Sequence, residues 1–169
     1  LPPLVNGLAA VADAVWPQTC LACHAWIVGD HAMCERCDAE LAALRASGYC
    51  ARCGRLAGLP GALDDGCRGC RSESFWNVAE VARLGPYVGG LRQLILALKY
   101  GGSAGIAGWL GQALADEIRA RPWPPVDVIV PVPMHWLRRL QRPGDHALMI
   151  AEELVAALRR SGRSNARVV

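Results

Sequence analysis

The sequence has little of what marks membrane or nucleic-acid-binding proteins. No run of apolar residues approaches the roughly 20 that a membrane-spanning helix requires. Lysine is nearly absent, since Lys99 is the one lysine beside 17 arginines, and the net charge of +3 is too small to indicate nucleic-acid binding by itself. No tract has a disordered composition. These absences argue against membrane insertion and leave a chain whose apolar residues, 53% of the total, suffice for a core.

The 169 residues suit one ordinary domain or a smaller domain with a mini-domain. Residues 4–15 are apolar, but they include Asp13 and follow no basic residue, so they predict an amphipathic helix rather than a signal peptide. Neither end of the chain has the features of a natural terminus, and we expect a fragment of a longer protein. Motifs divide it into an N-terminal helix (1–16), a cysteine-rich unit (17–75) and an α/β unit (76–169).

All eight cysteines fall in four Cys-x-x-Cys pairs, separated by 10, 12 and 13 residues. Two residues between ligands allow a tight turn in which both thiolates face one cation, and Gly54 and Gly69 ease the backbone there. Two such pairs form the four-thiolate site of a zinc ribbon, so four pairs predict two zinc ions that supply much of the folding energy. The predicted ligands are Cys20, Cys23, Cys34, Cys37, Cys50, Cys53, Cys67 and Cys70.

Other interpretations of the cysteines are disulfides, other metal chemistry, or a thiol-redox protein. His24 or His31 could replace a thiolate as a ligand. We expect the first pair to combine with the second and the third with the fourth, although an interleaved arrangement is compatible with the spacing. Zinc thiolates favour a reducing compartment, and hence the cytoplasm.

Arginines are interspersed with the cysteine pairs. They form either a solvated face or contacts with a phosphate backbone. The absence of interleaved lysines and aromatic residues favours the solvated face. These residues are Arg36, Arg45, Arg52, Arg55, Arg68 and Arg71.

The C-terminal part has the pattern of a strand, a helix and a second strand. The β-branched run 128–130 predicts a strand buried on both faces, as in a parallel sheet, and Pro131 ends its pairing. Asp145 is a good N-cap for the helix that follows, and 167–169 start the next strand. The order predicts a right-handed βαβ unit. Upstream, hydrophobic periodicity and alternation predict helices over 38–46, 89–100 and 103–119 and a strand over 77–84.

A cationic loop lies between the predicted strand and its helix, where α/β proteins hold phosphate-bearing ligands. Its side chains are those of His135, Arg138, Arg139 and Arg142, and each arginine could equally be an exposed loop charge. Lys99 either complements a helix C-terminus or contacts the same ligand.

The order of these features resembles the ComF family of phosphoribosyltransferase-like proteins, bacterial proteins associated with competence and DNA uptake. The matching features are the cysteine pairs, Tyr87, Leu-Arg-Gln-Leu-Ile-Leu-Ala-Leu-Lys-Tyr-Gly (91–101), Val-Pro-Val-Pro-Met-His (130–135) and Arg-Pro-Gly-Asp-His-Ala (142–147). The resemblance implies an α/β fold: an incomplete type I phosphoribosyltransferase-like parallel sheet under a hood, with an N-terminal double zinc-ribbon insertion.

The same resemblance implies that phosphoribosyl diphosphate binds with Mg²⁺ beside the first strand. The implied contacts are Lys99, Pro131, Val132, Pro133, His135, Arg138, Arg139, Arg142, Asp145 and His146. Pro143 replaces a glycine common in the family and removes a backbone N–H that could face a phosphate.

The family's phosphate cradle, an apolar strand ending in two acids before a Thr- and Gly-rich turn, has no counterpart here; Asp64 and Asp65 follow no strand pattern. No catalytic residue is therefore assigned, and transferase activity is expected of the complete protein alone. The alternative function is a zinc-ribbon scaffold that binds single-stranded DNA or a helicase partner without transferase activity.

Overall fold

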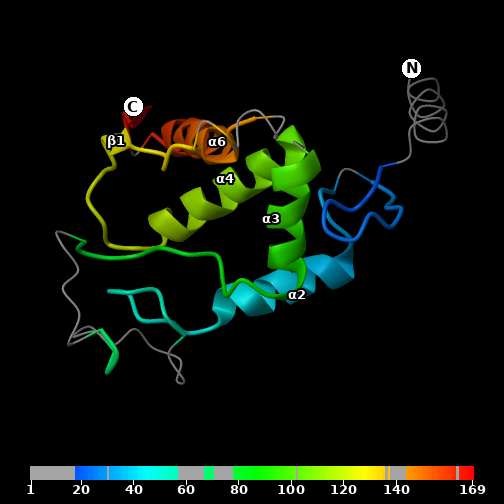
Figure 1. Cartoon of the computed structure of the whole chain (residues 1–169), viewed down its shortest axis with the longest axis horizontal. Helices are drawn as coiled ribbons and strands as arrows, with labels where there is room; N and C mark the ends of the chain where they lie inside the picture. The colour runs from blue at the N-terminus through cyan, green and yellow to red at the C-terminus, as the bar shows by residue number, and fades with distance from the viewer. Residues whose placement is uncertain are drawn as a thin grey trace, which may run out of the picture.

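The computed structural model describes residues 18–29, 31–56, 67–70, 78–101, 103–135, 137, 144–162 and 164–169. Its elements are α2 (Glu35–Ala46), α3 (Gly89–Gly101), α4 (Ala104–Arg119), β1 (Val128–Ile129), α6 (His146–Arg160) and β2 (Arg167–Val168). Figure 1 shows α3 rising from α2 to the start of α4, and α6 lying along α4. The helix predicted over 4–15 lies outside the described residues.

The helix predictions agree with the structure to within a few residues. The apolar stripe of α3 is buried at Leu91, Leu94 and Leu98 and packs against the start of α4. Helix α2 begins three residues earlier than predicted, because Cys34 leaves the ribbon in an extended conformation and takes the N-cap position. The sequence pattern therefore predicted the buried faces of the helices more accurately than the residues at which the helices begin and end.

Helices α4 and α6 form the most extensive contact between elements. Their backbones approach closely at Gly111, where a Cβ atom would lie 2.6 Å from Glu153 Cβ and 2.8 Å from the backbone nitrogen of Leu154. Helix α6 starts as predicted, because the Asp145 carboxylate accepts a hydrogen bond of 3.3 Å from the backbone N–H of Leu148.

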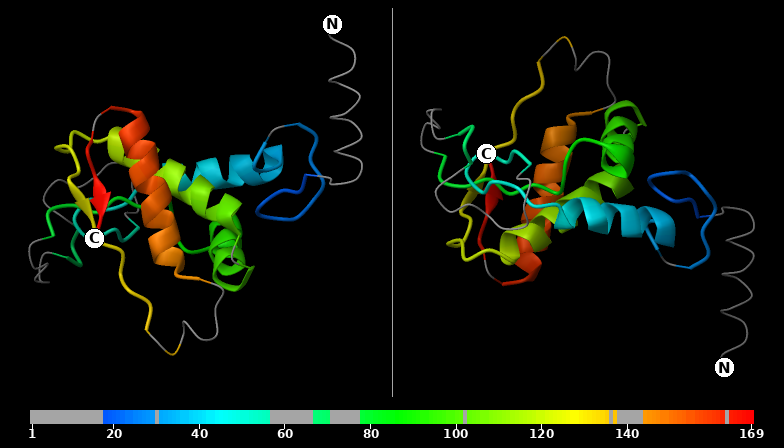
Figure 2. Two further views of the ribbon diagram at one scale, coloured as in Figure 1. Left: turned by 90° about the horizontal axis from the view of Figure 1, so that it is seen from above. Right: turned by 90° about the horizontal axis from the view of Figure 1, so that it is seen from below.

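The two strands confirm the predicted parallel pairing across a helix. Val128 pairs with Arg167 and Ile129 with Val168, and α6 connects the strands (Figure 2). The prediction of burial on both faces was wrong, because Val128 is 43% exposed and Val130 is 70% exposed. The helices cover one face through Ile129, whereas no described element covers the other.

The strand predicted over 77–84 was also wrong for the residues described there, 78–84. They run without regular pairing, and the backbone N–H of Val81 donates to the carbonyl oxygen of Ala51 at 2.6 Å. The weak alternation of this segment explains the error, since a long-range backbone hydrogen bond to the second ribbon takes the place of a sheet partner. Leu84 is nevertheless buried in the core.

The buried residues form two apolar clusters that share α4. The larger joins α2, α3 and the first half of α4, and the smaller joins the end of α4 to α6. Helix α4 contributes Ile106 and Leu110 to the first and Ala115 to the second. Across the described ranges, no helix has the length and apolarity needed to cross a membrane.

Candidate metal centres

The eight cysteines form two clusters, each made from two consecutive pairs. The first cluster holds Cys20, Cys23, Cys34 and Cys37, and the second holds Cys50, Cys53, Cys67 and Cys70; within each, all sulfur atoms lie within 4.8 Å of one another. The structure thus has the sequential arrangement, not the interleaved one. Neither cluster includes a histidine, and both His24 and His31 are exposed.

The sulfur separations fit a tetrahedral metal site rather than disulfides. Cys23 Sγ lies 3.8 Å from Cys34 Sγ, and in the second cluster the Cys53 and Cys67 sulfurs are 3.6 Å apart. A disulfide would bring two sulfurs to about 2.05 Å. Zinc bonds of about 2.3 Å to four thiolates place the sulfurs about 3.8 Å apart in a tetrahedron. Both clusters are therefore consistent with one zinc ion each.

A tight turn builds the first half of the first cluster. The backbone N–H of His24 donates to the carbonyl oxygen of Cys20 at 2.9 Å, and that of Cys20 donates to Ala25 at 2.8 Å. A bridge between Thr19 and Trp26 closes the base of the turn. These bonds bring the Cys20 and Cys23 thiols to the same side.

The second cluster repeats the same turn. The Gly54 N–H donates to Cys50 at 2.8 Å, the Cys50 N–H donates to Arg55 at 3.0 Å, and Tyr49 bridges to Leu56. Gly54 has a φ of 73°, which confirms its predicted role in the backbone. His24 occupies the equivalent position with a φ of 58°, a conformation that histidine adopts less readily than glycine.

The thiols within each cluster differ in acidity. Burial opposes ionisation of Cys20, but hydrogen bonds from the Cys23, Cys34 and Ala22 backbones outweigh it and lower its pKa to about 6. Burial and the neighbouring thiols raise the pKa of Cys37 to about 12. The four thiols cannot all ionise at this spacing without a cation between them, which is the requirement that a divalent metal meets.

The second cluster has the same asymmetry. The Cys53, Cys67 and Arg52 backbones overcome the effect of burial and lower the pKa of Cys50 to about 6, whereas burial and the other thiols raise the pKa of Cys70 to about 12. The Cys67 backbone N–H also donates to Cys50 Sγ at 3.2 Å. The Cys53 side chain and the Cys70 and Gly69 backbones also lower the pKa of Cys67, against the effect of burial. In each cluster, backbone donors therefore prepare at least one thiol for ionisation.

An arginine accompanies the first cluster. A hydrogen bond and the charge of the Cys23 thiolate raise the pKa of Arg36. Four thiolates around one Zn²⁺ carry a net charge of −2, and the guanidinium offsets part of it. Arg36 therefore has an electrostatic partner and is more than a member of a solvated face.

The implied phosphate-binding residues are spread along the C-terminal part. Lys99 lies in the last turn of α3, with Nζ 6.0 Å from the centre of the Tyr87 ring. The segment 131–135 runs outward from the helices, and Val132, Pro133 and His135 are exposed (Figure 2).

Two further implied residues, Asp145 and buried His146, meet at the start of α6. Arg138, Arg139 and Arg142 lie outside the described residues. The structure therefore joins two members of this set and leaves the ligand site itself a prediction.

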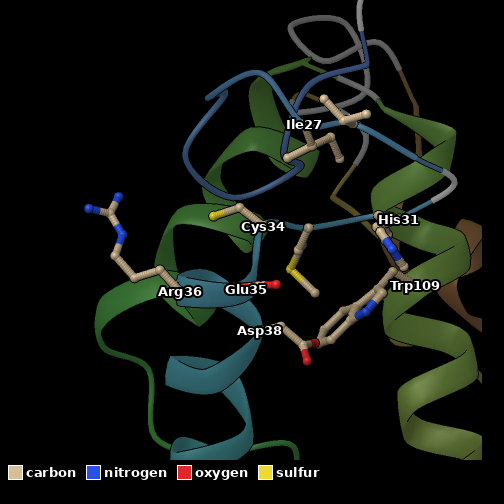
Figure 3. Close-up of a pocket in the computed structure, with 10 residues that line it drawn as sticks. Ile27, His31, Cys34, Glu35, Arg36, Asp38 and Trp109 are labelled. Atoms are coloured by element: carbon tan, nitrogen blue, oxygen red, sulfur yellow. The ribbon is translucent and has the colours of Figure 1, made fainter.

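A pocket of about 720 Å³ beside the first cluster was not foreseen from the sequence. Its lining includes Trp109 from α4 and the carboxylates of Glu35 and Asp38 from α2 (Figure 3). In the sequence, the two acids are typical of any first helical turn, and Trp109 fits the apolar stripe of its helix. The proximity of these groups depends on the tertiary packing of the ribbon and α4.

Comparison with known families supports the class assigned to the N-terminal region. Residues 11–72 match the family model of the double zinc ribbon domain. The match includes all eight cysteines and agrees with their two clusters. No curated protein and no solved structure matches the chain. The region is thus a double zinc ribbon, while the remainder of the chain is characterised by its helices and its βαβ unit.

Proposed function

We propose that this chain belongs to a ComF-like phosphoribosyltransferase-family protein, in which two structural zinc ions support a region that binds phosphoribosyl diphosphate with Mg²⁺. The observation that carries the proposal is the combination of a double zinc ribbon with a parallel βαβ unit farther along the chain. We also expect a reducing compartment such as the cytoplasm, because the eight cysteines are grouped as two sets of zinc ligands rather than as disulfides.

A structural role for zinc follows from the number of ligands. Four thiolates fill a tetrahedral site, whereas catalytic zinc keeps a position for water or substrate. The protein's own contribution is to present the eight thiols, with backbone donors stabilising Cys20 and Cys50 as thiolates. When bound, zinc would fix the two ribbons and hold α2 in place through Cys37.

The proposed ligand site is the region between β1 and α6. Asp145 caps α6, whose N-terminal backbone N–H groups and positive dipole end favour a phosphate nearby. Lys99 and the loop arginines would add positive charge, and guanidinium groups bind phosphate oxygens in pairs. Catalysis in such a site is positioning and charge stabilisation of the leaving pyrophosphate, so its residues are donors rather than nucleophiles.

Calorimetric titration of the zinc-loaded, full-length protein with phosphoribosyl diphosphate tests this proposal. Saturable binding that requires Mg²⁺ is expected, and R138A with R139A should weaken it by about tenfold or more. Arg92→Ala provides a matched control, because Arg92 is an exposed arginine on α3. Absence of binding, with zinc content and secondary structure intact, would reject the transferase-family function.

A second candidate is a scaffold that binds single-stranded DNA, or a helicase partner on DNA. Its supporting observation is that Arg52 and Arg68 are both exposed on the second ribbon. DNA affinity should fall with salt, and R52A with R68A should reduce the logarithmic slope by about 0.7 per lost phosphate contact. A slope shared with wild type and Arg92→Ala would reject this surface.

A further inference from the structure

The pocket beside the first zinc cluster combines an apolar floor with acidic walls. It lies between the first ribbon, the start of α2 and the side of α4 (Figure 3). Met33 is 6% exposed and Ile27 is half-buried, so the ribbon supplies an apolar surface at its base. The half-buried indole of Trp109 completes that surface from α4.

Two carboxylates in the pocket have no partner among the residues that the structure describes. Glu35 and Asp38 are exposed in the first turn of α2, and neither has a hydrogen bond or ion pair among the described residues. In Figure 3 Asp38 and His31 lie near the Trp109 ring, whereas the Arg36 side chain, which also belongs to the lining, points away from the cavity. The pocket therefore offers two negative charges next to an aromatic ring.

We propose that this pocket binds an arginine or lysine side chain presented by a partner protein. A cation over an indole is attracted by the ring, and carboxylates beside it add direct charge pairing. The positive dipole end of α2 weakens this attraction. A volume of about 720 Å³ accommodates a basic side chain together with its apolar neighbours.

Apolar side chains at the rim fit residues that flank the inserted cation. Val28 is 95% exposed at the pocket, and Trp26, two residues earlier on the same turn, is 80% exposed. Large exposed apolar side chains next to polar groups are typical of protein interaction sites. The favoured partner segment is therefore a basic residue between apolar ones.

The chain's own N-terminal segment does not supply the cation. The sequence has no arginine or lysine before Arg36. That segment also carries Asp13, whose charge has the same sign as the pocket's. Charge complementarity therefore favours a basic segment other than this one, and we assign it to a partner protein.

A peptide titration followed by nuclear magnetic resonance tests the proposal. The zinc-loaded chain, labelled with ¹⁵N, is mixed with acetyl-Leu-Arg-Leu-Arg-Leu-amide, and the Trp109 indole N–H is identified with W109F. We expect a saturable shift of that indole with an affinity in the millimolar range, weakened by salt. The matched peptide has citrulline in place of both arginines.

Charge variants then separate cation binding from apolar contact. E35Q with D38N should weaken binding of the arginine peptide by about tenfold, whereas the exposed control E152Q on α6 should leave it unchanged. Zinc content and circular dichroism verify that each variant is folded.

Three results would overturn the proposal. The first is an indole that does not shift, and the second is equal shifts with the citrulline peptide. The third is a shift caused by raising the protein concentration alone and removed by E35Q with D38N, which would make a second copy of the chain the occupant.

Discussion

The two ribbons share one local structure and differ in what surrounds it. In both, a turn of the same hydrogen bonds presents a Cys-x-x-Cys pair. Cys20 and Cys37 of the first cluster belong to the main apolar core. Cys50 and Cys70 of the second cluster are fully buried as well, but not in that core. Within the described ranges, the cysteines of the second belong to neither apolar cluster. The two ribbons thus share a local fold around their metal ligands. The residues packed around each ribbon determine how much of the protein's stability depends on that ribbon.

Polar contacts attach the second ribbon to the helices. Tyr49, next to Cys50, donates its hydroxyl to Glu117 on α4 at 3.1 Å and accepts from Arg121. The Arg83 guanidinium stacks 4.6 Å above the Tyr49 ring. These contacts hold the second ribbon against α4 and the segment after it, although its cysteines are not part of the apolar core.

Removing one zinc ligand from each cluster in turn should reveal the largest difference in stability between the two ribbons. Cys37→Ser removes a ligand within the core, and since a structural zinc site supplies about 10–16 kcal/mol, loss of the first zinc should unfold much of α2 and α3. Cys70→Ser should release the second zinc and leave α3, α4 and α6 protected. Metal analysis and hydrogen exchange measure both effects, and equal loss of protection in the two variants would contradict the difference described here.

A cavity created by mutation in the apolar core beside the first ribbon should have the next largest effect on stability. Leu94 is fully buried in the cluster that contains Cys20 and Cys37, so Leu94→Ala should lower the free energy of unfolding by about 2–5 kcal/mol. A chelator titration should then extract the first zinc more easily and the second at its usual concentration. Leu96→Ala, at a half-buried position on the same helix, is the control and should cost less.

Loss of the Tyr49 hydroxyl should affect the second ribbon alone. Tyr49→Phe keeps the ring between its arginines but leaves Glu117 and Arg121 with one polar partner fewer, at a cost of about 1–3 kcal/mol. Urea unfolding measures that cost, and hydrogen exchange should show earlier opening near Cys50. Unchanged stability would mean that the polar contacts do not hold this ribbon.

Exchanging the turn residues should have the smallest effects, with opposite signs. Gly54→Ala places a Cβ 3.1 Å from Val81 Cγ1 in a left-handed conformation and should destabilise the second ribbon by about 1 kcal/mol. His24→Gly should stabilise the first ribbon by up to about 1 kcal/mol, since glycine tolerates the φ of 58°. Thermal unfolding of the zinc-loaded variants tests both signs, and shifts in the same direction would exclude the shared backbone cause.

The sequence specified what depends on local spacing. The cysteine pairs predicted eight ligands for two metal sites, although the spacing left their combination into two sets open. Apolar periodicity located the buried faces of α3, α4 and α6. The Asp145 cap followed from a residue type with one strong local preference. Each of these features is decided within a few neighbouring residues.

Features that depend on packing between distant parts of the chain could not be predicted from local sequence patterns. The exposure of Val128 and Val130 follows from which elements lie beside β1, and β-branched residues alone do not reveal that. The pocket at Trp109 required α4 to approach the first ribbon, about 75 positions earlier in the chain. The Tyr49 attachment likewise joins residues far apart in sequence.

The close approach at Gly111 has a mechanical consequence. With backbone atoms of α6 within 3 Å of where a side chain would begin, neither helix has room to rotate or slide past the other. The two helices therefore behave as one rigid unit. At one end Ile106 packs in the apolar cluster that contains Cys20 and Cys37, and at the other Leu158 packs in the cluster that includes Ile129 of β1. If the first ribbon were displaced, α4 and α6 would tilt together, and β1 would move with them without any element unfolding.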